Sequence, residues 1–598
     1  MAKGPILINI KWAINFGTQL KSFISFMHMI LQSLKRYLCT GAIIIFFSLG
    51  CQPKSPLTSD ILGVTAENAM VVSARKEASA IGLSVMAQGG NAFDAMFATE
   101  LALAVVYPYA GNLGGGGFMV YRLADGSTGS LDYREMAPSA AHRDMFLDSL
   151  GNHDTAKSTL GGGSIAVPGT IKGIFEAHKK FGLLSVEALI NPVIELAENG
   201  YVVTQKQSER LAQYRDIITQ TTGIQTLYTQ EINPGDTIKN LALAKTLRQL
   251  RDQGQEAFYK GVMAEHMSHY IQAHGGVIQS EDFERYKVYW RDPVSFQYQD
   301  LTITSMGPPS SGGICLGQIM GMLESYNLGD LAHNSALYIQ HLTEAERRAY
   351  ADRSHYLGDP DFISIPTQKL LSRSYLDQKM TSFDADWATS SEDISHGPLT
   401  GHESDETTHY SIVDPMGNAV SVTTTINGAY GSKLFDPELG FFYNNEMDDF
   451  SAKPGTPNMF GLVGGAANAI APGKRMLSSM TPTIVTRQGQ LWQVLGTPGG
   501  STIITTVLQI ILNTHHFDMG MQTAVNQPRM HHQWLPDILQ FESEGFDGQL
   551  LDSLEQKGYK TIQKEHRIIG KVDAIMRHPN GVLEAGADPR GDDTALGF

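Results

Sequence analysis

Cysteine is scarce in this sequence, with only 3 among 598 residues, at positions 39, 51 and 315. So few cysteines do not make the framework of a disulfide-stabilised domain. Blocks of Lys and Arg are also absent, and 61 Asp and Glu outnumber 45 Lys and Arg to give a net charge of −16. The chain therefore lacks the basic surface that nucleic-acid binding requires.

The rest of the composition is that of a folded globular protein. Hydrophobic residues make up 42% of the chain, and its 60 glycines and 25 prolines form no repeat. This composition excludes a collagen-like, an intrinsically disordered and a polytopic membrane protein. The length is sufficient for a sizeable core, in several domains or in one large layered body.

The first fifty residues have the pattern of a bacterial export signal. Residues 1–37 carry basic but no acidic side chains, and an apolar run over 38–50 ends at Cys51. We therefore predict a signal peptide over 1–50, a tether over 51–59, and a location on the periplasmic side of the cell envelope. Cys51 follows Ser48-Leu49-Gly50, which resembles a lipobox with an atypical first residue, so lipidation at Cys51 is predicted. An uncleaved apolar helix is the alternative, and Met27 and Met29 are alternative start residues.

The next segment predicts helices followed by two strands. Apolar residues at three- and four-residue steps from about 66 to 106 predict two packed helices, with a break at Gly89-Gly90 and a capping Asn91. The glycine-rich run 111–117 opens onto strand-like residues 118–121 and 130–133, without the Gly-Lys-Ser/Thr of a phosphate-binding loop. Close backbone packing is therefore the preferred interpretation of these glycines. Residues 170–395 are predicted to be mostly helical.

Two β-hairpins are predicted after the polar loop 401–406. Residues 407–413 and 419–426 are β-branched and flank a turn centred on Met416, so antiparallel pairing places Thr407 opposite Thr425. A second hairpin pairs 482–485 with 491–495 around position 489. Its open end gathers Ser478 and Ser479 with Gly499 and Gly500, before a helix that runs to about 513. Backbone N–H groups at the start of that helix could hold an anion.

Thr407 is a candidate nucleophile because of its place at the start of a strand. A threonine hydroxyl is a poor nucleophile unless a base takes its proton, and a chain-terminal threonine can use its own α-amine for this purpose. An ordinary strand threonine is the alternative interpretation of Thr407 alone.

A series of sequence motifs, in the same order along the chain, indicates a protein family. From about residue 60 to the C-terminus the sequence resembles the γ-glutamyltranspeptidases. The motifs that carry the resemblance are Gly89–Ala92, Asn112–Gly117, Asp132–Pro138, Tyr350–Arg353, Thr407–Ser411, Asn444–Phe450, Leu477–Met480 and Pro498–Ser501.

The resemblance implies a fold and a maturation step. The fold class is α+β, a four-layer αββα sandwich of the N-terminal-nucleophile hydrolase type. The precursor would cut itself between Glu406 and Thr407, giving a large subunit (60–406) and a small catalytic subunit (407–598) that remain together as a heterodimer. Thr407 would be the nucleophile with its own amine as base, and Thr425 would orient it. The backbone N–H groups of Gly499 and Gly500 would form the oxyanion hole.

The resemblance also implies the substrate. The enzyme would transfer the γ-glutamyl group of glutathione and related amides to water or to amino-acid and peptide acceptors, through a γ-glutamyl-threonine ester. Arg134, Ser478 and Ser479 would bind the α-carboxylate of the donor. The α-ammonium would be bound by Asn427, Glu446 and Asp449. No organic cofactor and no metal is expected.

Some features leave alternatives open. His409, His531 and His532 are interpreted as structural, because no third metal ligand stands at a suitable spacing. Position 446 is Glu, where bacterial members often have Gln, and Phe460 replaces the usual Tyr in the segment 451–468 that resembles the bacterial lid. Closure of this lid, and with it the balance of hydrolysis and transfer, is therefore open. The alternative functions are an acylase or poly-γ-glutamate depolymerase on the same scaffold, and an uncleaved, non-catalytic lipoprotein that binds γ-glutamyl compounds.

Overall fold

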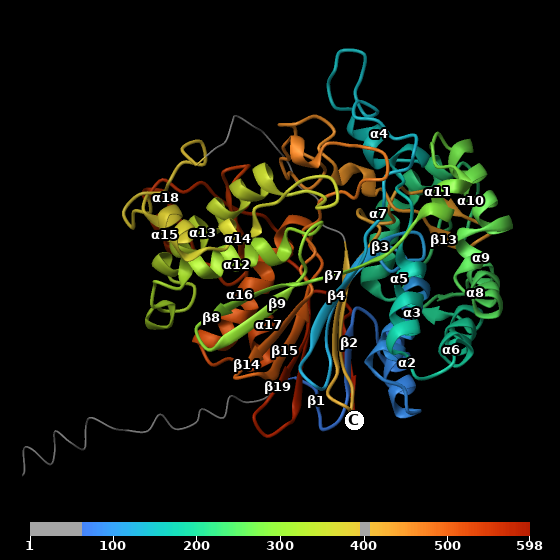
Figure 1. Ribbon diagram of the computed structural model, residues 1–598, viewed down its shortest axis with the longest axis horizontal. Coiled ribbons are helices and arrows are strands. Elements are labelled where there is room, and N and C mark those ends of the chain that lie inside the picture. Colours follow the sequence, from blue (N-terminus) through green and yellow to red (C-terminus); the bar gives the residue numbers. More distant parts are fainter. Residues whose placement is uncertain (1–62, 395–406) are drawn as a thin grey trace, which may run out of the picture. The chain divides into compact units, whose positions relative to one another are not determined.

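Two antiparallel sheets of seven strands each lie at the centre of the structure, a computed structural model that describes residues 63–394 and 407–598 (Figure 1). In spatial order, the first sheet consists of β1 (Thr65–Ala66), β20 (Leu583–Ala587), β19 (Asp573–Arg577), β15 (Gln490–Gly496), β14 (Thr483–Arg487), β9 (Leu301–Ser305) and β8 (Val294–Tyr298). The second consists of β21 (Thr594–Gly597), β2 (Met70–Ser73), β10 (Thr408–Val413), β11 (Ala419–Thr425), β3 (Gly116–Arg122), β4 (Thr128–Tyr133) and β7 (Tyr289–Arg291).

Helices cover the outer face of each sheet. The second sheet is covered on the right of Figure 1 by α2 (Lys76–Ala87), α3 (Ala92–Val106), α5 (Thr170–Phe181) and α6 (Val186–Asn199). Beyond them lie α7 (Gln205–Thr222), α8 (Leu241–Gln253), α9 (Glu256–Tyr259), α10 (Gly261–Ala273) and α11 (Ser280–Arg285). The first sheet is covered on the left by α12 (Gly312–Leu323), α13 (Ala336–Tyr356), α14 (Thr367–Leu370), α15 (Arg373–Met380), α16 (Ile503–His516), α17 (Met521–Asn526) and α18 (Gly548–Gln556).

The two sheets and the helices on the outer face of each sheet make four layers, and an apolar core lies between each pair of neighbouring layers. One core lies between the two sheets and includes Val72, Phe118, Ile484 and Ile575. The other two lie between each sheet and its helices. Because a sheet buries side chains on both faces only when a layer covers each face, this arrangement is the predicted αββα sandwich.

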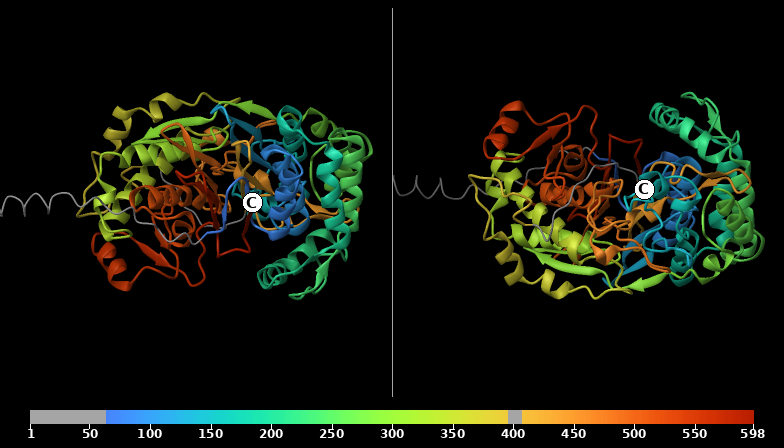
Figure 2. Two further views of the ribbon diagram at one scale, coloured as in Figure 1. Left: turned by 90° about the horizontal axis from the view of Figure 1, so that it is seen from below. Right: turned by 90° about the horizontal axis from the view of Figure 1, so that it is seen from above.

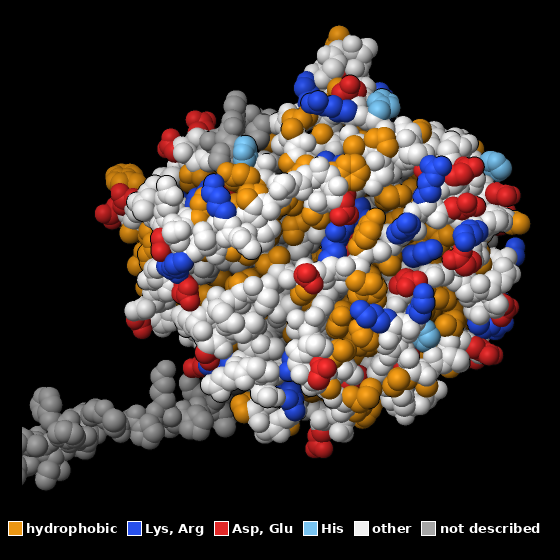
Figure 3. All heavy atoms as spheres, in the orientation of Figure 1, with side chains coloured by type: hydrophobic (Ala, Val, Ile, Leu, Met, Phe, Trp, Pro, Cys, Tyr) orange, Lys and Arg blue, Asp and Glu red, His pale blue; other side chains and the backbone are white. Residues whose placement is uncertain are grey.

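Apart from short 3₁₀ turns, the remaining elements of the described residues are short and lie outside the two main sheets. They are the helix α4 (Thr155–Thr159) and the strands β5 (Tyr201–Val202), β6 (Thr237–Ile238), β12 (Phe435–Asp436), β13 (Phe441–Phe442), β16 (Met530–His531), β17 (Leu539–Phe541) and β18 (Thr561–Gln563). On the face drawn in Figure 3, Lys and Arg side chains are interspersed with Asp and Glu.

The first hairpin has the predicted register. In β10 and β11, Thr408 pairs with Thr424 and Val413 pairs with Ala419, so the pairing is centred on Met416. Strands β2 and β3 flank this hairpin in the sheet. The catalytic candidates at its open end are therefore carried by central strands that are buried on both faces.

The second hairpin is also confirmed. Thr483 pairs with Leu495, which centres β14 and β15 on position 489, and a bulge between Val485 and Thr486 shifts the register near the turn. The helix after the hairpin begins with a 3₁₀ turn at Gly500 and continues as α16, three residues beyond the predicted end.

The helix boundary at Asn91 is confirmed as well. The Asn91 side chain accepts hydrogen bonds from the backbone N–H groups of Phe93 and Asp94, and Asp94 accepts one from the Asn91 N–H. This reciprocal capping satisfies N–H groups that the first turn of α3 leaves without partners.

One helix of the sequence prediction is wrong, and some strands were not predicted. The predicted helix from about residue 66 begins only at Lys76, because Met70–Ser73 form β2. A short apolar run such as Met-Val-Val fits a buried strand as well as a helix, and only pairing with β10 decides between them. The described part of the region 170–395 is mostly helical, as predicted, but it also contains β5, β6, β7, β8 and β9. Of these, β8 and β9 form a hairpin that turns at Gln299.

Several predictions concern residues that the structure does not describe. The signal peptide (1–50), the tether (51–59), lipidation at Cys51 and the residue before the cleavage point, Glu406, lie outside the described residues. Within the described residues, no helix is both long and apolar enough to cross a bilayer.

Candidate active site

Thr407 lies at the wall of a small buried cavity of about 20 Å³ at the open ends of the two hairpins. Its side chain is 4% exposed, and its Oγ1 lies 3.5 Å from Oγ1 of Thr425. The cavity brings together nearly all of the predicted site residues. Its lining includes Arg134, Thr407, Thr425, Asn427, Glu446, Asp449, Ser478, Ser479 and Gly500, and also Arg353, Phe460, Leu462, Met480 and Ile503.

Thr425 is held by the backbone beyond the end of β11. Its Oγ1 accepts a hydrogen bond of 2.7 Å from the N–H of Asn427, a residue in the left-handed region with φ of 70°. The Asn427 amide in turn donates to the carbonyl of Asn445 at 3.0 Å. The Thr425 hydroxyl is thus oriented next to Thr407, and Asn427 is turned toward the acidic segment.

Asn112 fixes the other side of the hairpin end. Its amide donates to the carbonyl of Thr425 at 3.0 Å and to Oγ1 of Thr424 at 3.2 Å, and its Oδ1 accepts from the N–H of Gly115 at 2.9 Å. A Cβ on Gly115 would overlap the carbonyl oxygen of Thr425. The glycine-rich run therefore serves close backbone packing, as predicted, and it positions the strand that carries Thr425.

Gly499 and Gly500 form the turn that enters α16. Both have positive φ values, 134° and 55°, which strongly favour glycine. A Cβ on Gly500 would lie 2.5 Å from the ring of Phe460. Gly500 lines the Thr407 cavity, whereas Gly499 lines a second cavity on the other side of the same turn.

Arg134 and the acidic residues face one another across the cavity. Arg134 is 1% exposed; it pairs through Nη1 with Glu446, through Nη2 with Asp449 at 2.5 Å, and more distantly with Glu135 at 3.5 Å. Burial raises the pKa of Glu446 and of Asp449, and the Arg134 charge opposes this rise. Burial also raises the pKa of Glu135 to about 7.

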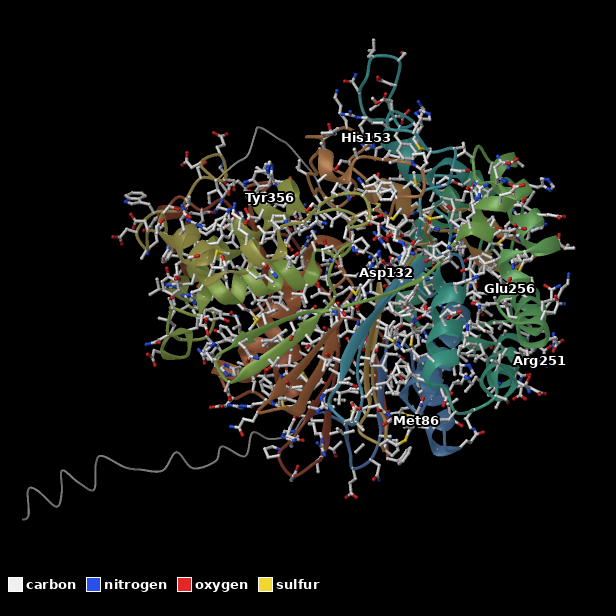
Figure 4. The ribbon with its side chains drawn as sticks, in the orientation of Figure 1. Met86, Asp132, His153, Arg251, Glu256 and Tyr356 are labelled. Atoms are coloured by element: carbon white, nitrogen blue, oxygen red, sulfur yellow. The ribbon has the colours of Figure 1, made fainter. Side chains whose placement is uncertain are left out.

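The position of Arg134 follows from the end of β4. Its backbone N–H donates to Oδ1 of Asp132 at 2.9 Å, and Asp132 also pairs with Arg291 at 2.7 Å and with Arg475. Asp132 lies near the centre of the view in Figure 4, where β4 ends. The buried ion pairs of Asp132 with Arg291 and Arg475 thus hold the end of β4 from which the Arg134 side chain extends into the cavity.

Ser479 is held by a cation that sequence reasoning did not assign. Arg353 donates from Nη2 to Oγ of Ser479 at 3.0 Å and from Nε to Oγ of Ser311 at 2.9 Å. Oγ of Ser478 accepts from the N–H of Met480 at 3.1 Å. Arg353 belongs to a motif that carried the family resemblance, and this was the available signal for its role.

The lid-like segment 451–468 packs over the cavity. Phe460 is 3% exposed and lines the cavity beside Gly500. The Asn458 amide donates to Oδ1 of Asp449 at 3.1 Å, and the N–H of Met459 donates to Oδ2 of Asp448 at 2.8 Å. The segment is thus tied to the acidic residues by polar contacts that do not need a hydroxyl at position 460.

The buried histidines hold structural positions. His409 bonds to Oγ1 of Thr423 at 2.9 Å and lies 3.2 Å from Oγ of Ser411, and burial lowers its pKa to about 3. Burial likewise lowers the pKa of His532 to about 4. A histidine with so low a pKa is neutral near pH 7. Over the described ranges, no group of three or more His, Cys, Asp or Glu side chains is placed to hold a metal ion.

The chain is similar to known proteins over most of its length. Residues 78–598 match the sequence family described as gamma-glutamyltranspeptidase. The glutathione hydrolase proenzyme of Escherichia coli (strain K12) is 43% identical over 563 residues, which are 92% of this chain and 97% of that protein. The solved γ-glutamyltranspeptidase of Helicobacter pylori is 41% identical, with a TM-score of 0.52 over 53% of this chain and 92% of that chain. A cephalosporin acylase from Bacillus halodurans has a TM-score of 0.79 at 24% identity over 92% of this chain and 99% of that chain, a likeness of fold alone.

Proposed function

Because the chain belongs to the γ-glutamyltranspeptidase family, we propose that it is a γ-glutamyltransferase and glutathione hydrolase with Thr407 as its nucleophile. The observation that carries this proposal is the Thr407 cavity, where a threonine hydroxyl lies beside a buried arginine and buried carboxyl groups. A γ-glutamyl donor presents an α-carboxylate and an α-ammonium at one end and the reactive carbonyl at the other. Opposite charges beside one hydroxyl suit such a donor.

Maturation would precede catalysis. We propose that the Thr407 hydroxyl attacks the carbonyl of Glu406 and that the peptide C–N bond breaks, which gives an ester and frees the Thr407 amine. Water then opens the ester, which gives the carboxyl group of Glu406 and restores the Thr407 hydroxyl. The products are a large subunit (60–406) and a small subunit (407–598). Their association is supported by the second sheet, in which β2 and β3 of the large subunit flank β10 and β11 of the small one. The heterodimer is thus one folded unit.

Donor binding would replace the ion pairs within the cavity by ion pairs to the substrate. The α-carboxylate would bind Arg134 together with the hydroxyls of Ser478 and Ser479. The α-ammonium would bind Glu446 and Asp449, which would then pair with the substrate ammonium in place of the Arg134 guanidinium. Asn427 would be a further acceptor. A guanidinium offers the paired donors that a carboxylate prefers.

The chemical steps then need only groups of this chain. The Thr407 amine takes the hydroxyl proton, and a terminal amine has a reference pKa of about 7.7–8.0, so a fraction is neutral near pH 7. The Thr407 Oγ1 attacks the γ-carbonyl, and the N–H groups of Gly499 and Gly500 stabilise the oxyanion. The leaving amine takes the proton and departs, and the γ-glutamyl-threonine ester is opened by water or by an acceptor amine.

The cellular location is a separate proposal. The chain would be exported, cleaved before Cys51 and held to the envelope by a lipid on Cys51, so that it acts on the periplasmic side. The support is the sequence pattern of residues 1–51.

Intact-mass analysis, N-terminal sequencing and a γ-glutamyl-p-nitroanilide assay on one sample test the enzymatic proposal. We expect two chains, one beginning at Thr407, and release of p-nitroaniline from the anilide. A cleaved protein that is inert toward the anilide would favour the acylase or depolymerase. A single intact chain without turnover would favour the γ-glutamyl-binding lipoprotein.

A further inference from the structure

A buried acid stands in the middle of α3, in the helix layer that packs on the second sheet. Every residue of α3 is buried, and the helix is apolar apart from Asp94, Thr99 and Glu100. In both views of Figure 2, the blue segment that contains α2 and α3 lies next to the C-terminus, which follows β21 of the second sheet. A carboxyl group buried among apolar residues lowers stability unless its hydrogen bonds are made. The contacts of Glu100 must therefore account for its place.

The two oxygens of the Glu100 carboxyl join the two strands of the first hairpin. Oε2 accepts from the hydroxyl of Tyr410 in β10 at 2.8 Å, and Oε1 accepts from the hydroxyl of Thr424 in β11 at 2.8 Å. Burial raises the pKa of Glu100 to about 7, and these two hydroxyls, rather than a cation, oppose the rise. Oγ1 of Thr424 also accepts from the Asn112 amide at 3.2 Å, so the bridge continues to the glycine-rich run.

The bridge and the catalytic candidates lie on opposite faces of this hairpin. Side chains alternate between the two faces along a strand, and Tyr410 and Thr424 are on the face toward α3. Thr407 and Thr425 are one or three positions away, so they belong to the other face, and both line the cavity. Glu100 thus holds the strand ends from behind and does not reach the substrate.

The two threonines leave little room for a displacement of either strand. Their Oγ1 atoms are 3.5 Å apart, longer than the separation of about 2.7–2.8 Å that is usual between hydrogen-bonded hydroxyls. Movement of the strand ends away from each other would therefore break this contact. Arg134 and Asp449 of the proposed donor site are paired with each other and belong to other segments. Such a movement should affect the chemical step more than donor binding.

We propose that Glu100 is a positioning residue of the active site, which bridges β10 and β11 through Tyr410 and Thr424 and so holds Thr407 beside Thr425. The inference rests on the proposed role of Thr407 as the nucleophile. Because α3 belongs to the large subunit and both strands belong to the small one, the bridge also ties the two chains together behind the nucleophile.

The test separates the chemical step from donor binding in the mature heterodimer. Rapid mixing with excess γ-glutamyl-p-nitroanilide gives the rate of the first p-nitroaniline release and the donor concentration at half of the maximal rate. Glu100→Leu removes both acceptors and keeps a side chain of similar size. We expect the rate to fall by about 10- to 100-fold, because a displacement of about 1 Å can cost about 10²-fold, while the half-saturating donor concentration changes little.

Conservative variants distinguish positioning from a general effect on stability. In Glu100→Gln the amide oxygen can accept from one hydroxyl and the amide N–H can donate to the other, so this variant should retain most of the rate. Tyr410→Phe and Thr424→Val each remove one end of the bridge and should each lower the rate in part, even if Glu100→Leu does not mature. Tyr338→Phe is the control, because it removes a buried hydroxyl that has no hydrogen-bond partner among the described residues.

Three results would overturn the inference. The first is a wild-type rate in mature Glu100→Leu, and the second is a wild-type rate in both Tyr410→Phe and Thr424→Val. The third is a half-saturating donor concentration that rises as much as the rate falls, which would place the effect in donor binding. None of these contradicts the proposed function, which fails if the wild-type protein releases no p-nitroaniline.

Discussion

Replacing Arg134 by Met is the sharpest test of the ion-pair geometry. Arg134 is 1% exposed and pairs with Glu446 and Asp449, so the variant leaves buried carboxyl groups without their cation. Removing one partner of a buried ion pair destabilises a protein by about 3–5 kcal/mol. It should also raise the KM for a γ-glutamyl donor by about tenfold or more, because the α-carboxylate loses a charge-assisted pair.

The pH dependence of this penalty gives the test a second readout. Burial already raises the pKa values of Glu446 and Asp449, and loss of Arg134 removes the charge that opposes this rise. A carboxyl with a raised folded-state pKa contributes stability that is fully present below its unfolded pKa and is lost as the pH rises through the folded value. The thermal midpoint of Arg134→Met should therefore lie closer to that of the wild type at pH 5 than at pH 8.

Arg134→Lys is the matched control. It keeps a positive charge but loses the planar pair of donors, so it should recover much of the stability and little of the donor affinity. Thermal unfolding of the mature heterodimer and KM for the anilide separate the two effects. A wild-type KM in Arg134→Met, or a stability penalty that does not change between pH 5 and pH 8, would refute this account of the cavity.

Three further predictions concern other parts of the site. Thr407→Ala should run as one uncut chain on a denaturing gel and should show no turnover in the anilide assay. An active Thr407→Ala protein would show that Thr407 is not the nucleophile. Gly500→Ala should lower kcat by about 10²-fold, because Gly500 has a φ of 55° and a Cβ there would contact Phe460 at the proposed oxyanion hole. Gly473→Ala is the control, because Gly473 also has a positive φ but has open space around its Cβ position, and this variant should leave kcat unchanged. Burial raises the pKa of Asp448 to about 7, so the stability that the protonated carboxyl contributes is lost as the pH rises from about 4 through 7. Asp448→Asn should therefore lose less thermal stability between pH 5 and pH 8 than the wild type. Equal losses in the two proteins would count against the protonated Asp448.

The predictions that succeeded depend on neighbours along the chain. The Asn91 cap, the turn at Met416 and the turn near 489 are set by residues within a few positions of each other, and strand pairing around a turn follows from its centre by symmetry. This is why the spacing of residues along the chain is enough to place Thr407 and Thr425 side by side. The ordered motifs extended the same information to the family and its four-layer fold.

The strands that the sequence did not predict depend on distant partners. Met70–Ser73 could form a strand or a helix until β10 and β21 supplied hydrogen bonds on both sides, and β8 and β9 needed β14 as a neighbour in the first sheet. Arg353 lies more than a hundred positions from Ser479, so its contact could not be inferred from local spacing.

The sequence by itself thus determined the family and the hairpin that carries Thr407 and Thr425, because these are set by ordered motifs and by local patterns. Only the tertiary structure decided which buried charges face one another, since Arg134 meets Glu446 and Asp449 through the packing of segments that lie far apart in the chain. It alone also placed Glu100 beside Tyr410 and Thr424, because Glu100 lies more than 300 positions from both in the chain and meets them only through tertiary packing.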